Sequence, residues 1–216
     1  MLNNADLHET MHSKQLLLRT HHQKRERAGY YDEQYFYKVW VPNWEHAKVS
    51  RHVFEVGYYD LEIVPAFRCF LTHQGLDRGY IMHLGQVIGG SADNWDRLVN
   101  NTTKEQRIKF IKTIFERAMV HESIVSDMAP SNVILYDGKI SLIDLEAHAS
   151  FNWLFKQQPK IWEAQSRNMN KVPSPLWRDM SKYLLSYLDQ CVGIKYDKKL
   201  DCVDNLAEVN DILRGL

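Results

Sequence analysis

The chain has 216 residues, 44% of them hydrophobic, which is enough to bury a core in one domain or in two small lobes. Lys and Arg together number 27, as do Asp and Glu, so a net charge of zero gives no reason to expect a nucleic-acid or anionic-membrane partner. Three cysteines without paired metal-ligand spacing argue against a disulfide framework and for a reducing compartment.

The beginning of the chain has the pattern of neither a signal peptide nor a membrane span. Residues 1–22 contain no long apolar stretch, and no window approaches the roughly 18 apolar residues that a spanning helix needs. We therefore expect a soluble, cytoplasmic protein.

The first part of the chain predicts a small β-rich unit with one helix. Aromatic and branched residues favour strands, and the spacing of apolar residues before Gly57 favours a helix. In chain order we expect a strand at "KQLLLRT" (14–20), a polar segment "HHQKRERAG" (21–29), a strand over 30–41, a helix over 43–61, and strands at "PAFRCFLTH" and "RGYIMHLG" joined by a turn. This unit is expected to span residues 1–88.

After "GGSADN" the pattern changes, and residues 89–216 predict a mostly helical unit. Thr102 and Glu105 have the spacing of a capping box, followed by a long amphipathic helix to about His121. "NVILY", the turn pair Asp137-Gly138, and "ISLID" predict a β-hairpin. Further helices are expected at about 159–168, 176–192 and 204–213, so the fold class is α+β.

The hairpin carries a pattern of polar residues suited to chemistry. Asp127 and Asn132 are five residues apart around Pro130, and Asp144 ends the second expected strand. The two outer ends of a hairpin lie close together, so Asn132 and Asp144 can face one site with Asp127 nearby. Two oxygen ligands supplemented by phosphate oxygens and water suit Mg²⁺, and a free carboxylate can orient a hydroxyl for phosphoryl transfer. As alternatives, Asp127 caps a turn and the other two are ordinary hairpin-edge residues.

The run "SDMAPSNVILYDGKISLIDLE" resembles the catalytic loop and metal-binding hairpin of the protein kinase-like superfamily, in a small, atypical form. The resemblance implies a two-lobed fold, a catalytic Asp127, Mg²⁺ or Mn²⁺ ligands Asn132 and Asp144, and ATP as phosphate donor. The triplet is "DLE" instead of the usual Asp-Phe-Gly, Val125-Ser126 replace the usual His-Arg, and Ala129 stands where many members have Lys.

The same resemblance assigns roles in residues 14–88. Lys38 in "FYKVW" matches the strand lysine that holds the nucleotide phosphates, and Glu55 is the first choice of its helix partner, ahead of Glu45 and Glu62. The backbone around His83 and Leu84 would bind adenine. The alternatives are that Lys38 extends to solvent from an edge strand and that Glu55 is an ordinary surface residue.

The phosphate loop departs from the family pattern, because Gly29 is the single glycine in "RTHHQKRERAG". Arg25 and Arg27, with neighbouring basic residues, can neutralise phosphate by charge, or they form a solvated hairpin tip. We expect an ATP-dependent phosphotransferase whose acceptor is a protein Ser/Thr hydroxyl or a small-molecule or glycan hydroxyl. The alternative is a catalytically weak pseudokinase that binds a nucleotide or a protein.

Overall fold

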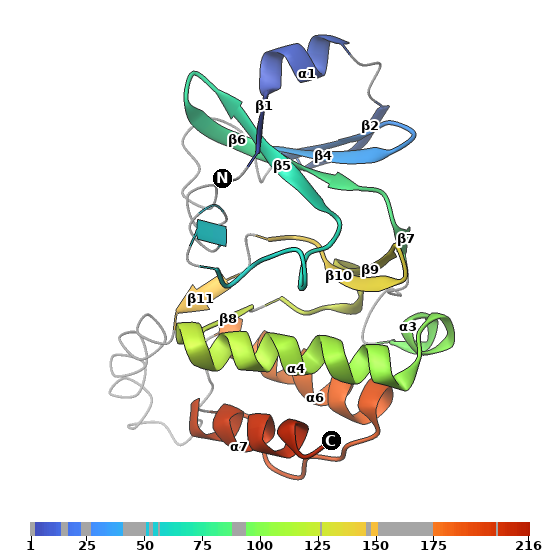
Figure 1. The fold of residues 1–216 in the computed structure, drawn as a ribbon, viewed down its shortest axis with the longest axis vertical. Coiled ribbons are helices and arrows are strands. Elements are labelled where there is room, and N and C mark those ends of the chain that lie inside the picture. The colour runs from blue at the N-terminus through green and yellow to red at the C-terminus, as the bar shows by residue number, and fades with distance from the viewer. Residues whose placement is uncertain are drawn as a thin grey trace. The chain divides into compact units, whose positions relative to one another are not determined.

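The computed structural model describes residues 3–13, 17–22, 27–40, 51, 54–55, 57–87, 94–125, 127–145, 148–150, 175–201 and 203–216. The chain is a mixed α+β protein that divides into two compact units, residues 1–86 and 87–216 (Figure 1). The boundary lies two residues before the one expected from the change in sequence pattern. No helix in the described ranges combines the length and apolar character that crossing a membrane requires.

The first unit is built on a six-stranded sheet in the order β1-β5-β6-β4-β3-β2. Its elements are β1 (Asn4–Asp6), α1 (Leu7–Ser13), β2 (Leu17–His22), β3 (Arg27–Tyr31), β4 (Tyr35–Trp40), β5 (Phe67–His73) and β6 (Leu76–His83). β1 runs parallel to β5, whereas the other neighbours are antiparallel. The expected strands at β5 and β6 are confirmed, and β1 and α1 were not expected from the sequence.

The single strand expected over residues 30–41 is wrong, because Asp32 turns the chain between β3 and β4. Its Oδ1 accepts hydrogen bonds from the backbone N–H groups of Gln34 (2.8 Å) and Tyr35 (2.7 Å). The Tyr37 hydroxyl donates to Oδ2 at 2.5 Å. A short Asp side chain that bonds the backbone two and three residues on stabilises a turn, and here it outweighs the strand preference of the surrounding aromatic residues.

The helix expected over 43–61 ends earlier than the sequence suggested. Arg51, Phe54 and Glu55 are helical, whereas Gly57 has a φ of 79° and the Asp60 carboxylate accepts backbone bonds from the next turn. Residues 41–50 lie outside the described part of the chain. Glycine adopts the left-handed conformation without steric cost, which ends the helix here.

The second unit is organised around α4 (Lys104–His121), which confirms the expected long helix. Its buried side chains recur at helical spacing, at Arg107, Phe110, Ile111, Ile114, Phe115 and Ala118. The other helical elements are α3 (Asp96–Asn101), α6 (Pro175–Tyr187), a π-helical turn η2 (Leu188–Val192) and α7 (Val203–Arg214). They confirm the last two expected helices, whereas the helix expected at 159–168 lies outside the described residues.

The capping box of α4 lies one residue later than expected. Thr103 is the N-cap, and its hydroxyl accepts the backbone N–H of Gln106 at 3.2 Å while the Gln106 side chain accepts the Thr103 N–H at 2.7 Å. Gln106 also donates to the carbonyl of Gly138 at 2.7 Å, which ties the start of α4 to the hairpin turn. Thr102 instead donates its hydroxyl to the Leu98 carbonyl of α3.

Arg107 joins three elements of the second unit. Among the described residues its side chain is bound by backbone carbonyls and not by a carboxylate. Its Nε donates to the Cys191 carbonyl (2.7 Å) and its guanidinium also donates to the carbonyls of Val99 (3.2 Å) and Thr102. The Tyr187 hydroxyl donates to the backbone carbonyl of Arg107 at 3.0 Å. We call these five residues the Arg107 network; it connects the end of α3, the first turn of α4 and η2.

Short strands complete the second unit and place its polar loop. The expected hairpin is confirmed as β9 (Val133–Tyr136) and β10 (Lys139–Leu142), with β7 (Gln86–Val87) beside β9 at the boundary between the units. Asp137 and Gly138 have φ values of 48° and 69°, the positive pair that a tight hairpin turn of the primed type needs. β8 (Ser123–Val125) pairs with β11 (His148–Ser150), a pair that was not expected.

Candidate functional site

The loop that carries Asp127 is held by hydrogen bonds among its own residues. The Asp127 Oδ1 accepts the backbone N–H of Ala129 at 3.3 Å, and the Asn132 side-chain nitrogen donates to the Asp127 carbonyl at 3.3 Å. A 3₁₀ turn over Pro130–Asn132 leads into β9. These bonds fix Asp127 and Asn132 relative to each other, five residues apart in sequence.

The hairpin register brings Asp144 next to Asn132. Leu142 is the last residue of β10 and pairs with Val133, and beyond it the Ile143 N–H donates to the Asn132 carbonyl at 2.8 Å. Asp144 follows immediately, with a φ of 63° in the left-handed region. Asp and Asn tolerate that conformation better than other L-residues, and such backbone positions are common at functional sites.

The three polar side chains are accessible on a buried frame. Asp127, Asn132 and Asp144 are half-buried, while their neighbours Met128 (1% exposed) and Leu145 (0%) are in the core. None of these three residues is fully buried, in contrast to Met128 and Leu145.

The donor set around Asn132 fits a magnesium ion that takes most of its ligands from elsewhere. The Asn132 nitrogen is committed to the Asp127 carbonyl, which leaves the side-chain oxygen as the ligand atom, and Asp144 adds a carboxylate. Mg²⁺ typically uses one or two protein oxygens with phosphates and water. The described residues include no cluster of three or more His, Cys, Asp or Glu side chains suited to hold a metal alone.

In the first unit, Lys38 lies on β4 at the centre of the sheet. It pairs with Gly29 of β3 on one side and with Tyr80 of β6 on the other, and its Nζ is 5.7 Å from the centre of the Tyr80 ring. The sequence reasoning missed Gly79, although a lone glycine inside a strand pattern often marks a close backbone approach. A Cβ at Gly79 would overlap the Lys38 carbonyl oxygen, so only glycine lets β6 pack against β4 here.

The structure does not bring the expected partner to Lys38. Glu55 is exposed, and no ion pair between Lys38 and Glu55 occurs among the described residues. Glu62 is also exposed and lies in the Asp60 turn, while Glu45 is outside the described ranges. The pairing of Lys38 with Glu55 therefore stays a prediction for the nucleotide-bound protein.

The backbone N–H groups of His83 and Leu84 are already used within the first unit. His83 donates to the Ala66 carbonyl at 2.7 Å and Leu84 to the Gln34 carbonyl at 2.9 Å. These two N–H groups are therefore engaged in this structure, and the expectation that backbone groups around His83 and Leu84 bind adenine stays a prediction. Burial, and secondarily the nearby Arg68, lower the pKa of the His83 imidazole, which favours its neutral form.

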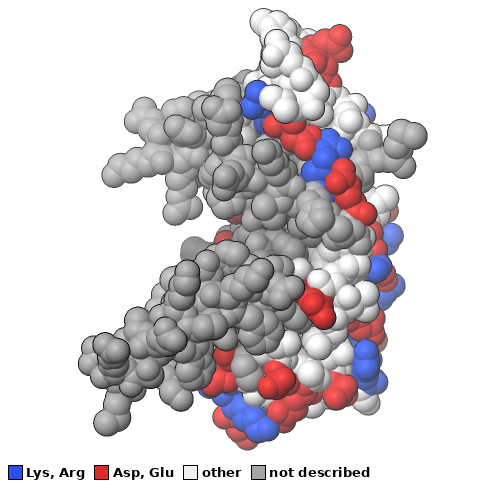
Figure 2. All heavy atoms as spheres, turned by 90° about the vertical axis from the view of Figure 1, so that its left-hand side faces the viewer, with Lys and Arg blue, Asp and Glu red and all other residues white. Residues whose placement is uncertain are grey.

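The two basic residues expected to replace a glycine-rich loop are only partly placed. Arg27 begins β3 and pairs with Trp40 through the backbone, and Arg25 lies outside the described residues. Their role at a phosphate stays a prediction. Figure 2 shows Lys and Arg interspersed with Asp and Glu over the described part of the face in view, without a large patch of one sign.

No protein-family model matches the chain, and no curated protein matches it.

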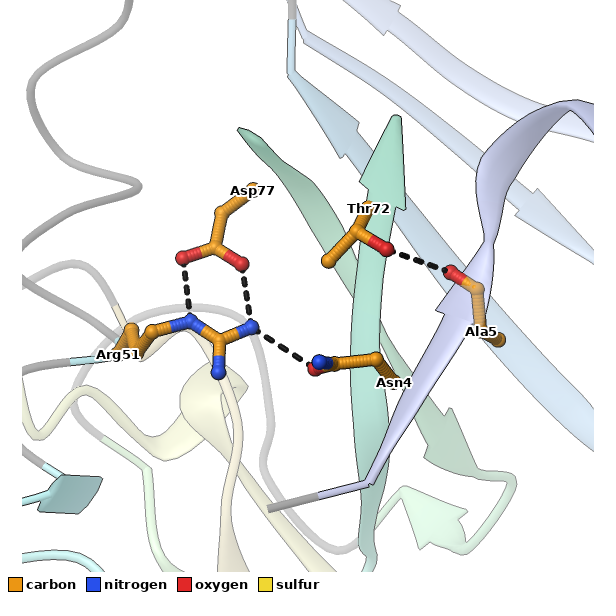
Figure 3. A network of polar contacts seen from close by, with 5 residues as sticks. All are labelled: Asn4, Ala5, Arg51, Thr72 and Asp77. Carbon is orange, nitrogen blue, oxygen red and sulfur yellow. Dashed lines mark hydrogen bonds and ion pairs between the residues drawn. The ribbon is translucent and has the colours of Figure 1, made fainter. Parts of the chain in front are cut away.

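A second polar cluster, not anticipated from the sequence, lies in the first unit (Figure 3). Arg51 binds both carboxylate oxygens of Asp77, with 2.5 Å between Nε and Oδ2, and donates to the Asn4 side-chain oxygen at 2.9 Å. Its guanidinium lies 4.4 Å from the centre of the Phe70 ring. The hydrogen bond to Asp77 is the main cause that raises the Arg51 pKa. Because Arg51 and Asp77 are 26 residues apart, no local pattern predicts this contact.

Proposed function

We propose that the chain is a kinase-like phosphotransferase that moves the γ-phosphate of ATP to a hydroxyl group. The observation that carries this proposal is the register of the β9–β10 hairpin, which sets Asp144 beside Asn132 through the bond from Ile143 N–H to the Asn132 carbonyl. The Asn132 side chain in turn holds the loop of Asp127. Asp127, Asn132 and Asp144, which carry the most specific part of the resemblance, thus lie at the open end of one hairpin and in the loop that leads into it.

Each residue has a distinct role in the proposed reaction. Asp127 orients the acceptor hydroxyl and accepts its proton through a carboxylate that the Ala129 N–H holds in place. Asn132 and Asp144 bind Mg²⁺ through one oxygen each. The ion, when bound, neutralises charge on the phosphate oxygens. Lys38 binds the α- and β-phosphates, with Glu55 as its partner in the nucleotide-bound protein.

The acceptor class stays open between a protein Ser/Thr hydroxyl and a hydroxyl of a small molecule or glycan. The breadth of the superfamily favours a protein. Separate analysis of protein and small-molecule fractions, after incubation of a host extract with labelled ATP, decides between them.

A second candidate, a binding module with the same architecture and weak turnover, is favoured by two observations in the first unit. The Glu55 side chain is exposed, and the backbone N–H groups of His83 and Leu84 already donate to the carbonyls of Ala66 and Gln34. Both observations reduce the groups that are ready to hold a nucleotide. The two candidates differ in turnover and not in the metal-binding hairpin.

A thermal-shift measurement with ATP, with and without Mg²⁺, tests the proposal at Asp144. We expect ATP to raise the melting temperature only when Mg²⁺ is present. Asp144→Asn should remove this metal-dependent shift while keeping the backbone conformation, because Asn also tolerates positive φ. Asp137→Asn is the matched control, since it makes the same change in the turn of the same hairpin and should keep the shift. Absence of a metal-dependent shift in the wild-type protein would refute the phosphotransferase proposal.

Transfer of labelled phosphate then separates the enzyme from the binding module. Asp127→Asn keeps an oxygen for the Ala129 N–H, so it should preserve the MgATP shift. We expect it to slow transfer by roughly 100-fold or more, because a positioned acid–base group contributes about that much. Equal transfer by Asp127→Asn and wild type would show that Asp127 is not the catalytic carboxylate.

A further inference from the structure

The contacts of Arg51 join three segments that are far apart in sequence. We call Asn4, Arg51 and Asp77 the Arg51 clasp: Asn4 lies on β1, Arg51 in the helical segment before Gly57, and Asp77 on β6 (Figure 3). The clasp is partly shielded from water, since the side chains of Arg51 and Asp77 are 21% and 14% exposed. Its geometry is specific to arginine, because a planar fork binds both carboxylate oxygens while its face lies over Phe70.

The clasp restricts the segment that carries Glu55. Arg51 is bound to β6, and three residues later Phe54 is 8% exposed, with its ring 4.2 Å from that of Phe67. Glu55 follows Phe54 directly, so it is joined to a residue that packs on Phe67 and lies four residues after the polar attachment at Arg51. Its charge also contributes to raising the Arg51 pKa, behind the larger contribution of Asp77.

β6, whose Asp77 binds Arg51, also pairs with β4, the strand that carries Lys38. Asp77 lies near the start of β6, and Tyr80 of the same strand pairs with Lys38. Both residues of the predicted nucleotide-binding pair are therefore connected to β6. Lys38 is connected through backbone pairing of β4 with β6, and Glu55 through the contact of Arg51 with Asp77. The Asn4 contact adds β1 to this arrangement, although β1 has no catalytic candidate of its own.

We propose that Arg51 is a positioning residue of the nucleotide site: bound by Asp77 and Asn4, it fixes the Glu55 segment relative to the sheet that carries Lys38. This inference rests on the proposed function. It assigns to the N-terminal strand a role in nucleotide affinity, which depends on the acceptor oxygen of Asn4.

Steady-state kinetics of the full chain with MgATP test the role of Asn4. Asn4→Ala removes the oxygen that Arg51 binds, and we expect the KM for MgATP to rise about fivefold or more with kcat within about twofold, since nucleotide positioning and not chemistry is affected. Asn4→Asp keeps the acceptor oxygen and should keep the wild-type KM. A rise of KM in both variants, or in neither, would overturn the inference.

Thr72→Val is the matched control for a merely structural effect. The Thr72 hydroxyl donates to the Ala5 carbonyl at 3.5 Å, so this variant loosens β1 without touching Arg51. We expect its KM for MgATP to equal that of wild type. An increase equal to that of Asn4→Ala would show that the clasp acts only by stabilising the fold, which would overturn the inference. A wild-type protein that binds no MgATP refutes the proposed function and this inference together, whereas unchanged kinetics in Asn4→Ala with an active wild type refutes this inference alone.

Discussion

At the scale of single residues, Cys191 is a titratable group that the fold removes from water. The side chain is 2% exposed, and burial raises the pKa of its thiol from an ordinary value of 9.0 to about 12. The thiolate is the reactive form of cysteine, so this residue is protected from alkylation and oxidation at neutral pH. Because the folded protein keeps this thiol neutral at a pH where the unfolded chain ionises it, the free energy of unfolding depends on pH.

We predict that the free energy of unfolding falls as pH rises from about 9 toward 12. The unfolded thiol ionises near its ordinary pKa while the folded thiol stays neutral, so the stability is fully present below pH 9 and is lost above it. Burial also raises the pKa of Tyr187, whose contribution has the same sign but begins about one pH unit higher. Urea unfolding over this range measures the slope.

Cys191→Ala separates the two contributions, because it leaves Tyr187 in place. Its stability should depend less on pH than that of wild type between pH 9 and 10, whatever its absolute stability. Identical slopes in the two proteins would show that the Cys191 thiol does not titrate differently in the folded and unfolded states.

Single residues also mark where prediction from sequence succeeded and where it stopped. The Asp127, Asn132 and Asp144 spacing was sufficient to place these residues in one loop and hairpin, because the contacts that join them are local in sequence. The partner of Arg51 was out of reach, since Asp77 is brought to it by the sheet. Glu55 illustrates the same limit: helical spacing identifies a candidate but does not determine whether the side chain faces Lys38.

At the scale of elements, long periodic segments were predictable and short ones were not. α4, β5, β6 and the β9–β10 hairpin follow from apolar periodicity and turn residues. β1, β8 and β11 have three residues each, too few to show a period. The Asp32 turn was hidden in an aromatic run, and the capping box was misplaced because Thr102 with Glu105 and Thr103 with Gln106 fit the same spacing.

We predict that Gln106→Ala destabilises the protein more than Glu105→Ala does. Gln106 accepts the Thr103 N–H and donates to the Gly138 carbonyl, so its loss should cost about 1 kcal/mol or more. Glu105 lies in the first turn, where its pKa is lowered chiefly by a hydrogen bond to backbone, and its side chain is not part of the capping box. Thermal or urea unfolding of the two variants compares the costs, and an equal or larger loss for Glu105→Ala would place the capping box where the sequence first suggested.

At the scale of the whole molecule, each unit is held by an arginine that connects elements distant in sequence. Arg107 joins α3, α4 and η2 in the second unit, and Arg51 joins β1, the Glu55 segment and β6 in the first. Neither arrangement follows from a local pattern. Both connect elements that the sequence predicts one at a time.

We predict that Arg107→Ala destabilises the protein by about 3 kcal/mol or more. The substitution leaves the buried carbonyl of Cys191 and the partly buried carbonyls of Val99 and Thr102 without their donor, and a buried acceptor without a partner costs about 1–3 kcal/mol. Arg97→Ala on the exposed face of α3 is the matched control and should change stability by less than about 0.5 kcal/mol. Urea unfolding measures both, and a similar small effect for the two variants would show that water replaces the Arg107 contacts.

The acceptors of the Arg107 side chain are mainly backbone carbonyls, which carry no charge. Backbone carbonyls do not take up protons in the range where carboxylates do, so the bonds that Arg107 makes persist when the medium becomes acidic. The Arg51 clasp depends instead on an ion pair with Asp77, in addition to the neutral side-chain oxygen of Asn4. The two units are therefore cross-linked by different chemistry: an ion pair helps to hold the N-terminal strand of the β-rich unit, whereas the arginine of the helical unit binds neutral carbonyls.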